Sequence, residues 1–186
     1  MSLKNKIDEL IPLLNRLSDL ESEVEHVIEK MISAFDNGRK VMVFGNGGSA
    51  SDAAHMAGEL QGRFRFDRPG LPVLCLNTNM STITAVSNDL GYENIFRKQV
   101  EGLAVPGDVV IGITTSGNSV NVIKALEFAS DKDITTVCMT GKKDCRADEI
   151  CDLKLKVPSS DTPQIQEMHI MLIHHICEQV EKRMFG

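Results

Sequence analysis

Two short segments of this chain combine glycine with side-chain hydroxyls directly after an apolar run. Residues 45–51 (GNGGSAS) follow the apolar residues 41–44, and residues 114–119 (TTSGNS) follow the apolar residues 109–113. A strand that leads through small residues into a helix leaves backbone N–H groups free at the helix N-terminus, where phosphate groups bind. The two segments together predict one phosphorylated or polyhydroxylated ligand held at both ends.

Side chains suited to acid–base chemistry follow the first segment. His55 and Glu59 are four residues apart on the helix predicted to begin there, so both lie on one face of that helix. An imidazole and a carboxylate in this arrangement can share a metal ion or a substrate, although an ordinary exposed pair has the same spacing. On the last predicted helix, polar side chains interrupt an apolar pattern, and each must be hydrogen-bonded, exposed or part of a site. These are Gln166, Glu167, His169, His174 and His175.

The first loop does not match a nucleotide site. Residues 45–50 satisfy the G-x-G-x-x-A pattern, but the following strand ends in Leu76-Asn77-Thr78 and offers no acidic side chain to a ribose. No lysine follows the glycines, which excludes a nucleotide-hydrolase P-loop. We therefore expect no nucleotide cofactor.

Composition limits the remaining classes of function. A length of 186 residues suits one domain with a sizeable core. The net charge is −6, the pI is near 5.4, and no dense run of Lys or Arg occurs, so we expect no nucleic-acid partner. No apolar stretch is long enough to span a bilayer or resembles a secretory signal, and the five cysteines lack metal or disulfide spacing. These features predict a cytoplasmic protein without a membrane partner.

Apolar runs with the period of strands alternate with runs of helical period after residue 38. We predict strands at 41–45, 72–77, 109–113, 134–139 and 153–157, and helices at 50–62, 81–103 with a break at Gly91, 119–130 and 162–184. Two amphipathic helices precede them. This alternation predicts an α/β fold with a parallel sheet covered on both faces, and ligands in such sheets bind beyond the carboxyl ends of the strands. The last helix is apolar on too many sides for a surface helix, so it is either central in the fold or shared with another subunit, and we favour an oligomer.

Several motifs together resemble those of the sugar isomerase (SIS) domain family, and more narrowly those of the bacterial phosphoheptose isomerases. They are residues 45–60 (GNGGSASDAAHMAGEL), residues 62–72 (GRFRFDRPGLP), Asn88-Asp89 with Gly91-Tyr92, residues 115–119 (TSGNS) and residues 165–169 (IQEMH). The resemblance spans nearly the whole chain. It implies a single SIS domain over residues 1–186, with residues 1–38 as an N-terminal helical extension to a three-layer α/β/α sandwich. The sheet of that fold has five parallel strands in a flavodoxin-like order.

The resemblance also implies an activity and an assembly. The reaction is the conversion of sedoheptulose 7-phosphate to D-glycero-D-manno-heptose 7-phosphate, a first step towards heptose precursors of lipopolysaccharide or capsule. The assembly is a homotetramer whose active sites lie at subunit interfaces. A proton moves between adjacent carbons through an enediol in this reaction, which needs a base and an acid, and no redox cofactor is required.

The residues implied by position fall into three groups. Glu59 and His174 are the catalytic residues, and His55, Glu59, Gln166 and His174 are the zinc ligands of the family's metal-bound form. The substrate is held by Asn46, Gly47, Gly48, Glu59, Asn88, Asp89, Thr114, Thr115, Ser116, Ser119 and Gln166. Gln166 and His174 are eight residues apart, about 12 Å along a helix. One ion reaches both only if it lies between them or if the ligands come from different subunits, so we rank zinc below the acid–base pair.

Two other readings and two departures from the family pattern remain. A non-catalytic SIS tetramer that binds a protein partner, such as a replication initiator, shares the scaffold, but retention of His55, Glu59, Gln166 and His174 favours the enzyme. A sugar-sensing transcription regulator needs a DNA-binding domain, for which the residues before the first strand are too few.

Thr162-Pro163-Gln164 replaces an acidic or small residue followed by Arg in the family pattern, which puts contacts from that turn in doubt. Thr114 replaces a serine and keeps the hydroxyl.

Overall fold

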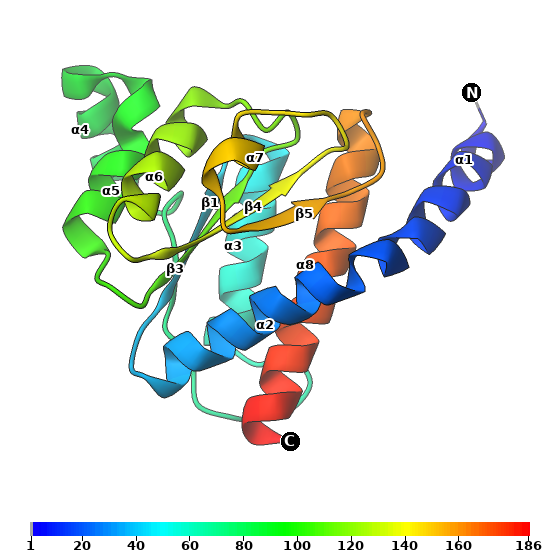
Figure 1. Ribbon diagram of the computed structural model, residues 1–186, viewed down its shortest axis with the longest axis horizontal. Helices are drawn as coiled ribbons and strands as arrows, with labels where there is room; N and C mark the ends of the chain where they lie inside the picture. Colours follow the sequence, from blue (N-terminus) through cyan, green and yellow to red (C-terminus); the bar gives the residue numbers. More distant parts are fainter. Residues whose placement is uncertain (1) are drawn as a thin grey trace.

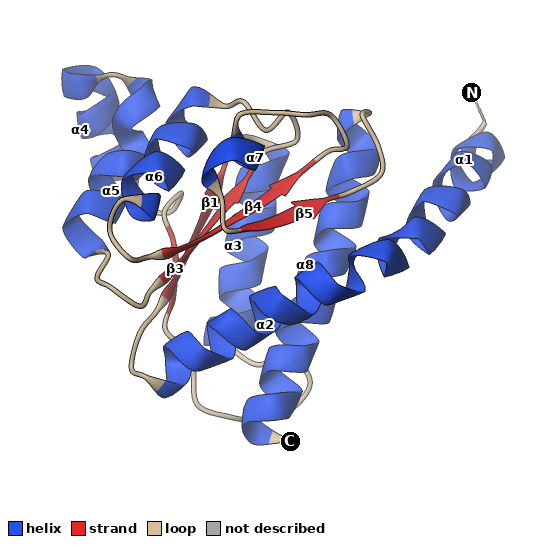
Figure 2. Cartoon of the chain, viewed as in Figure 1, coloured by secondary structure: helices blue, strands red, loops and turns tan. Residues whose placement is uncertain are grey.

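The computed structural model describes residues 2–186, so the first residue of the predicted 1–38 extension lies outside the described part. Five parallel strands form one sheet in the order β2-β1-β3-β4-β5. Their bounds are β1 Val41–Gly45, β2 Val73–Cys75, β3 Val109–Ile113, β4 Thr135–Thr140 and β5 Leu153–Lys156. The sheet and its flavodoxin-like order confirm the predicted fold class (Figure 2).

Helices cover both faces of the sheet (Figure 1). One face packs against α2 (Glu21–Asp36), α3 (Gly48–Gln61) and α8 (Thr162–Phe185), and the other packs against α4 (Met80–Leu90), α5 (Ile95–Leu103), α6 (Val120–Ser130) and α7 (Ala147–Ile150). The first helix, α1 (Leu3–Asn15), is joined to α2 by the 3-10 turn η1 (Arg16–Leu20) and projects away from the sheet. Within residues 2–186 no helix is both long and apolar enough to cross a lipid bilayer.

The central strands are apolar throughout because they are buried on both faces. In β1, Val41 and Val43 pack into the core beneath α2, α3 and α8, whereas Met42 and Phe44 pack into the core beneath α5 and α6. Successive strand side chains point to opposite faces. This packing places the ends of β1 and β3 side by side, with Gly45 in register with Ile113. The two loops that follow therefore meet at one edge of the sheet.

The boundaries differ from the predictions where side chains replace strand or helix hydrogen bonds. Strand β2 ends at Cys75 instead of 77 because the Asn77 side chain bonds to Gly45, accepting from its N–H at 3.2 Å and donating to its carbonyl at 2.8 Å. The predicted helix 81–103 breaks into α4, the 3-10 turn η2 (Tyr92–Asn94) and α5. Gly91 lies at this break with φ of +89°, a conformation that favours glycine. The short helix α7 was not predicted.

Candidate active site

A pocket of about 310 Å³ lies between the two loops and the start of α8. The first loop contributes four consecutive residues, the second loop contributes three hydroxyl-bearing residues, and α8 contributes a threonine and a glutamine. Its predicted lining residues are Asn46, Gly47, Gly48, Thr114, Thr115, Ser119 and Gln166, joined by Ser49, Ile113 and Thr162. The structure thus brings together residues separated by more than a hundred positions, in keeping with one ligand held by both loops.

The side chain of Asn46 ties the first loop to the helix that follows the second. Its Nδ2 donates to Oδ1 of Asn121 and its Oδ1 accepts from Nδ2 of Asn121, both at 2.9 Å, and the Tyr92 hydroxyl donates to the same Oδ1 at 3.0 Å. Asn121 is 3% exposed. Because the amide of Asn46 is engaged in this way, a ligand meets mainly the backbone of the first loop. Sequence reasoning missed Asn121, whose only signal is an amide between two valines in the first turn of a helix.

The hydroxyls of the second loop converge on one another. The Thr114 hydroxyl lies 3.0 Å from the Ser119 hydroxyl and 3.5 Å from that of Ser116. The Asn118 N–H donates to the Ser116 hydroxyl at 3.2 Å, and Gly117 has φ of +67° within the turn. Hydroxyl and backbone N–H groups gathered in this way can donate hydrogen bonds to the oxygens of a phosphate.

A second pocket of about 300 Å³ lies on the outer side of this loop and shares Thr115 and Thr162 with the first. It contains Ser116 and the positively charged Lys142 and Lys143. Ser116 therefore faces this outer pocket, whereas the other predicted hydroxyl residues line the inner one.

The Gln166 amide packs against the backbone of the first loop. A Cβ atom added to Gly48 would lie 2.8 Å from Cδ and 2.9 Å from Oε1 of Gln166. The glycine is thus required for this close approach, and the contact is at the first turn of α3. Gln166 is half-buried and opens onto the inner pocket.

Three predicted site residues meet further along α3 and α8. The Nε2 atoms of His55 and His174 are 3.0 Å apart, and His55 Nε2 is 3.0 Å from Oε1 of Glu59. The ring of Phe64 lies 6.0 Å from that of His174. The His55 and Glu59 side chains keep 42% and 27% of their surface exposed. His174 thus joins the pair that the spacing predicted on one helix face, so His55 and Glu59 are not an ordinary exposed pair.

The same three side chains are suited to a divalent metal ion. Their ligand atoms lie within 4.8 Å of one another, and two imidazoles with one carboxylate form a donor set that zinc uses in catalytic sites with an open position. Gln166, the fourth predicted ligand, contacts Gly48, which precedes His55 by seven residues or about 10 Å of helix. The structure therefore supports a three-residue donor set more directly than the predicted set of four.

Asn88 and Asp89 do not line the pocket of the single chain. Both are exposed at the end of α4, where Nδ2 of Asn88 donates to Oδ1 of Asp89 at 2.7 Å. Their predicted contact with substrate therefore does not arise from the packing of one chain.

The other polar residues of α8 take structural or surface positions. His169 is fully buried beside the carbonyl of Thr140, with its Nε2 at 3.3 Å from that oxygen. Burial lowers the pKa of His169 to about 4, although the bond to Thr140 acts in the opposite direction. Glu167 and His175 are exposed. None of the three lines the inner pocket.

A parallel sheet, two hydroxyl-bearing loops at one edge and a convergent His–Glu–His group describe a phosphosugar-binding α/β domain. Residues 7–141 match the model of the SIS domain family. The match covers most of the chain, which therefore belongs to this family.

Comparison with individual proteins narrows the assignment. The chain is 51% identical over 169 residues to a phosphoheptose isomerase from Trichlorobacter lovleyi, an alignment covering 91% of this chain and 86% of that relative. The solved structure of a phosphoheptose isomerase from Neisseria gonorrhoeae superposes with a TM-score of 0.89 at 35% identity, covering 97% of this chain and all of that one. A phosphoheptose isomerase from Francisella tularensis gives a TM-score of 0.88 at 32% identity. Within the SIS domain family the chain is a member of the phosphoheptose isomerases, and the protein is an isomerase.

Proposed function

We propose that this isomerase converts sedoheptulose 7-phosphate to D-glycero-D-manno-heptose 7-phosphate, for heptose precursors of lipopolysaccharide or capsule. The observation that carries the proposal is the convergence of Glu59 and His174 from α3 and α8, the two helices whose first turns line the pocket built from both ligand loops. Relatives named phosphoheptose isomerase at about half identity support it.

The two loops have different tasks in this proposal. The hydroxyls of Thr114, Thr115 and Ser119, with Ser116 from the outer side, hold the phosphate, helped by the backbone N–H groups at the start of α6. The backbone of Gly47 and Gly48 holds the sugar hydroxyls together with the Gln166 amide. The chain of the sugar then extends along α3 towards Glu59.

The chemical step is a pair of balanced proton transfers. Glu59 accepts a proton from C1 of the ketose while His174 donates a proton to the C2 carbonyl oxygen, which gives an enediol. Return of a proton to C2, with loss of the proton of the C1 hydroxyl, then gives the aldehyde. Each transfer leaves the phosphate bound, so the residues that hold the phosphate are different from those that move the protons.

A metal ion is compatible with the same group of residues. His55, Glu59 and His174 would hold zinc, and a bound ion would polarise the oxygens of the reacting carbons in place of proton donation by His174. In this assignment Gln166 binds the substrate. It becomes the fourth zinc ligand only if its side chain turns away from Gly48.

The proposal extends to assembly and location. Residues 1–186 act as one SIS domain, and residues 1–38 serve a homotetramer with interfacial active sites. Support comes from α1, which buries none of its residues and exposes Leu3, Ile7 and Ile11, and from the exposed positions of Asn88 and Asp89. A cytoplasmic location accords with the five free cysteines. Light scattering coupled to size-exclusion chromatography measures the mass of the particle in solution, which should equal that of four chains.

The direct test is incubation of purified protein with sedoheptulose 7-phosphate and detection of the aldose product. Removal of a general base or acid lowers turnover by about 100-fold or more, so we expect this loss in Glu59→Gln and in His174→Ala. His175→Ala is the matched control, because His175 is the exposed neighbour on the same helix. Full activity in both site variants would overturn the acid–base assignment. An inactive parent protein would favour the SIS scaffold that binds a protein partner.

A further inference from the structure

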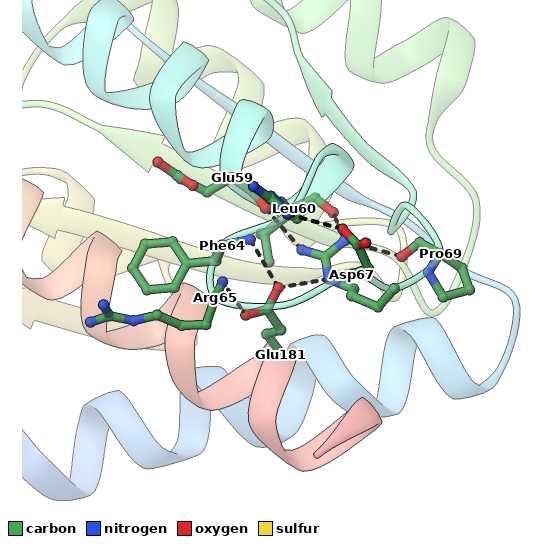
Figure 3. A network of polar contacts seen from close by, with 9 residues as sticks. Glu59, Leu60, Phe64, Arg65, Asp67, Pro69 and Glu181 are labelled. Carbon is green, nitrogen blue, oxygen red and sulfur yellow. Dashed lines mark hydrogen bonds and ion pairs between the residues drawn. The ribbon is translucent and has the colours of Figure 1, made fainter.

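A buried ion pair lies at the far end of the two helices that carry the reacting side chains. Arg68, in the segment between α3 and β2, places its Nε 3.1 Å from Oε1 of Glu181 on α8. Their side chains are 1% and 0% exposed. Figure 3 shows the Glu181 carboxylate lying between the end of α3 and the segment that follows it.

Every oxygen of this carboxylate is used. Glu181 accepts from the N–H of Phe64 at 2.9 Å and from the N–H of Arg65 at 2.7 Å, in addition to Arg68. Burial by itself raises the pKa of Glu181, but these two N–H groups and Arg68 outweigh it and hold that pKa below its usual range. The carboxylate is therefore charged and fixes the backbone directly after α3 against α8.

The guanidinium of Arg68 completes the end of α3. Its Nη2 donates to the carbonyl of Glu59 at 2.8 Å, and its Nη1 donates to the carbonyls of Leu60 at 2.6 Å and Pro69 at 3.1 Å. Carbonyls in the last turn of a helix have no partner within the helix, and a planar guanidinium can serve several acceptors at fixed angles. The backbone of Glu59 is thus held directly, while Figure 3 shows its carboxylate pointing away from Glu181.

The pair is also linked to the opposite reacting residue. Glu181 lies two turns beyond His174 on α8. Phe64, whose N–H is bound by Glu181, places its ring 6.0 Å from that of His174. One carboxylate and one guanidinium therefore connect the backbone of Glu59 with the helix and the aromatic neighbour of His174.

We propose that Arg68 and Glu181 are positioning residues, which set the separation of Glu59 and His174 for proton transfer. The inference rests on the proposed function. Proton transfer requires its groups within hydrogen-bond reach of the reacting atoms, and misplacement by about 1 Å lowers rates by about 100-fold. The second loop, residues 114–119, which holds the phosphate in the proposed function, has no contact with this pair. Substitution of Arg68 or Glu181 should therefore lower kcat and leave KM unchanged.

The test compares steady-state kinetics of Arg68→Lys and Glu181→Gln with those of the parent enzyme, at a temperature well below each measured Tm. In Arg68→Lys the positive charge remains, but one ammonium group cannot donate to the carbonyls of Glu59 and Leu60 and to the Glu181 carboxylate at once. In Glu181→Gln the amide NH₂ group faces a backbone N–H, so two donors oppose each other. We expect kcat to fall tenfold or more in each variant, with KM within twofold. Circular dichroism and size exclusion establish that each variant is folded.

A matched control is the exposed pair between Arg65 and Glu178, which joins the same segment to α8 at 3.1 Å with 63% and 39% of the side chains exposed. This pair does not touch the end of α3, so we expect Arg65→Gln and Glu178→Gln to keep the parent kcat.

A double variant separates positioning from the cost of an unpaired buried charge. Arg68→Met with Glu181→Leu removes both charges together, so no unpaired charge stays buried. It also leaves the N–H groups of Phe64 and Arg65 and the carbonyl of Glu59 without their partners, so we expect a lower Tm. Measured well below that Tm, kcat should be as low as in the single variants. A parent-like kcat in the double variant, or in both single variants, would overturn the inference. Lack of turnover in the parent enzyme would instead overturn the proposed function.

Discussion

The buried His169 makes a prediction about stability against pH. Its side chain is fully buried, its Nε2 faces the Thr140 carbonyl, and its Nδ1 has no hydrogen-bond partner within residues 2–186. Burial lowers the pKa from 6.5 to about 4. Between these values the unfolded chain binds a proton that the folded chain does not, so acid stabilises the unfolded state.

The magnitude follows from the two pKa values. One unit corresponds to about 1.36 kcal/mol, and lowering the pH from 8 to 5 gives the unfolded histidine nearly its full charge while the folded one stays mostly neutral. His169 then contributes a loss of about 2 kcal/mol in the free energy of unfolding. The loss begins as the pH falls below about 7 and is complete only below pH 4.

The measurement is urea unfolding of the parent and of His169→Gln at pH 8 and pH 5. Glutamine places an amide donor where Nε2 lies, so it keeps the bond to Thr140 without a titrating group. All samples have the same protein concentration, because subunit association changes apparent stability. The parent should lose about 2 kcal/mol more than the variant between the two pH values. An equal loss in both proteins would refute the account of a neutral, buried His169.

Three further predictions concern the site. Gly48→Ala should raise KM severalfold with little change in Tm, because the added Cβ displaces the flexible end of the Gln166 side chain. Gly58→Ala on the same helix is the control: its added Cβ meets no atom within 4 Å, so KM should stay unchanged and Tm should rise slightly. Asn121→Ala should raise KM and lower stability by about 1 kcal/mol in urea unfolding, because it leaves the Asn46 amide without its reciprocal partner. If zinc serves the reaction, a chelator should lower turnover and added zinc should restore it. Zinc binding measured by calorimetry should be lost in His55→Ala. Unchanged turnover after complete removal of metal would exclude a role for zinc.

Local patterns were sufficient to predict the fold and parts of the site. The strand at 109–113 matches β3 residue for residue, and the apolar run at 41–45 matches β1, because strands buried on both faces leave an unbroken signal. Likewise, the four-residue spacing predicted that His55 and Glu59 share one face of a helix, and in the structure their side chains lie 3.0 Å apart.

Contacts between distant segments were beyond this reasoning. The bond between Asn46 and Asn121 depends on the adjacency of β1 and β3, and no spacing in the sequence marks Asn121 as a partner. In the same way, Arg68 and Glu181 are both charged residues that are usually exposed, and only the packing of α3 against α8 makes them a buried pair.

The sequence by itself therefore determined the order of the elements, the two strand–loop–helix segments and the family resemblance, since each motif is carried by residues close together along the chain. The family resemblance grouped His174 with His55 and Glu59, and the structure brings the three side chains together. Only the tertiary structure decided that Gln166 lies over Gly48 and that Asn88 and Asp89 stay outside the pocket. The physical reason is that helical periodicity fixes which face a residue occupies. The close packing of side chains between helices then sets which residues on two facing helices meet.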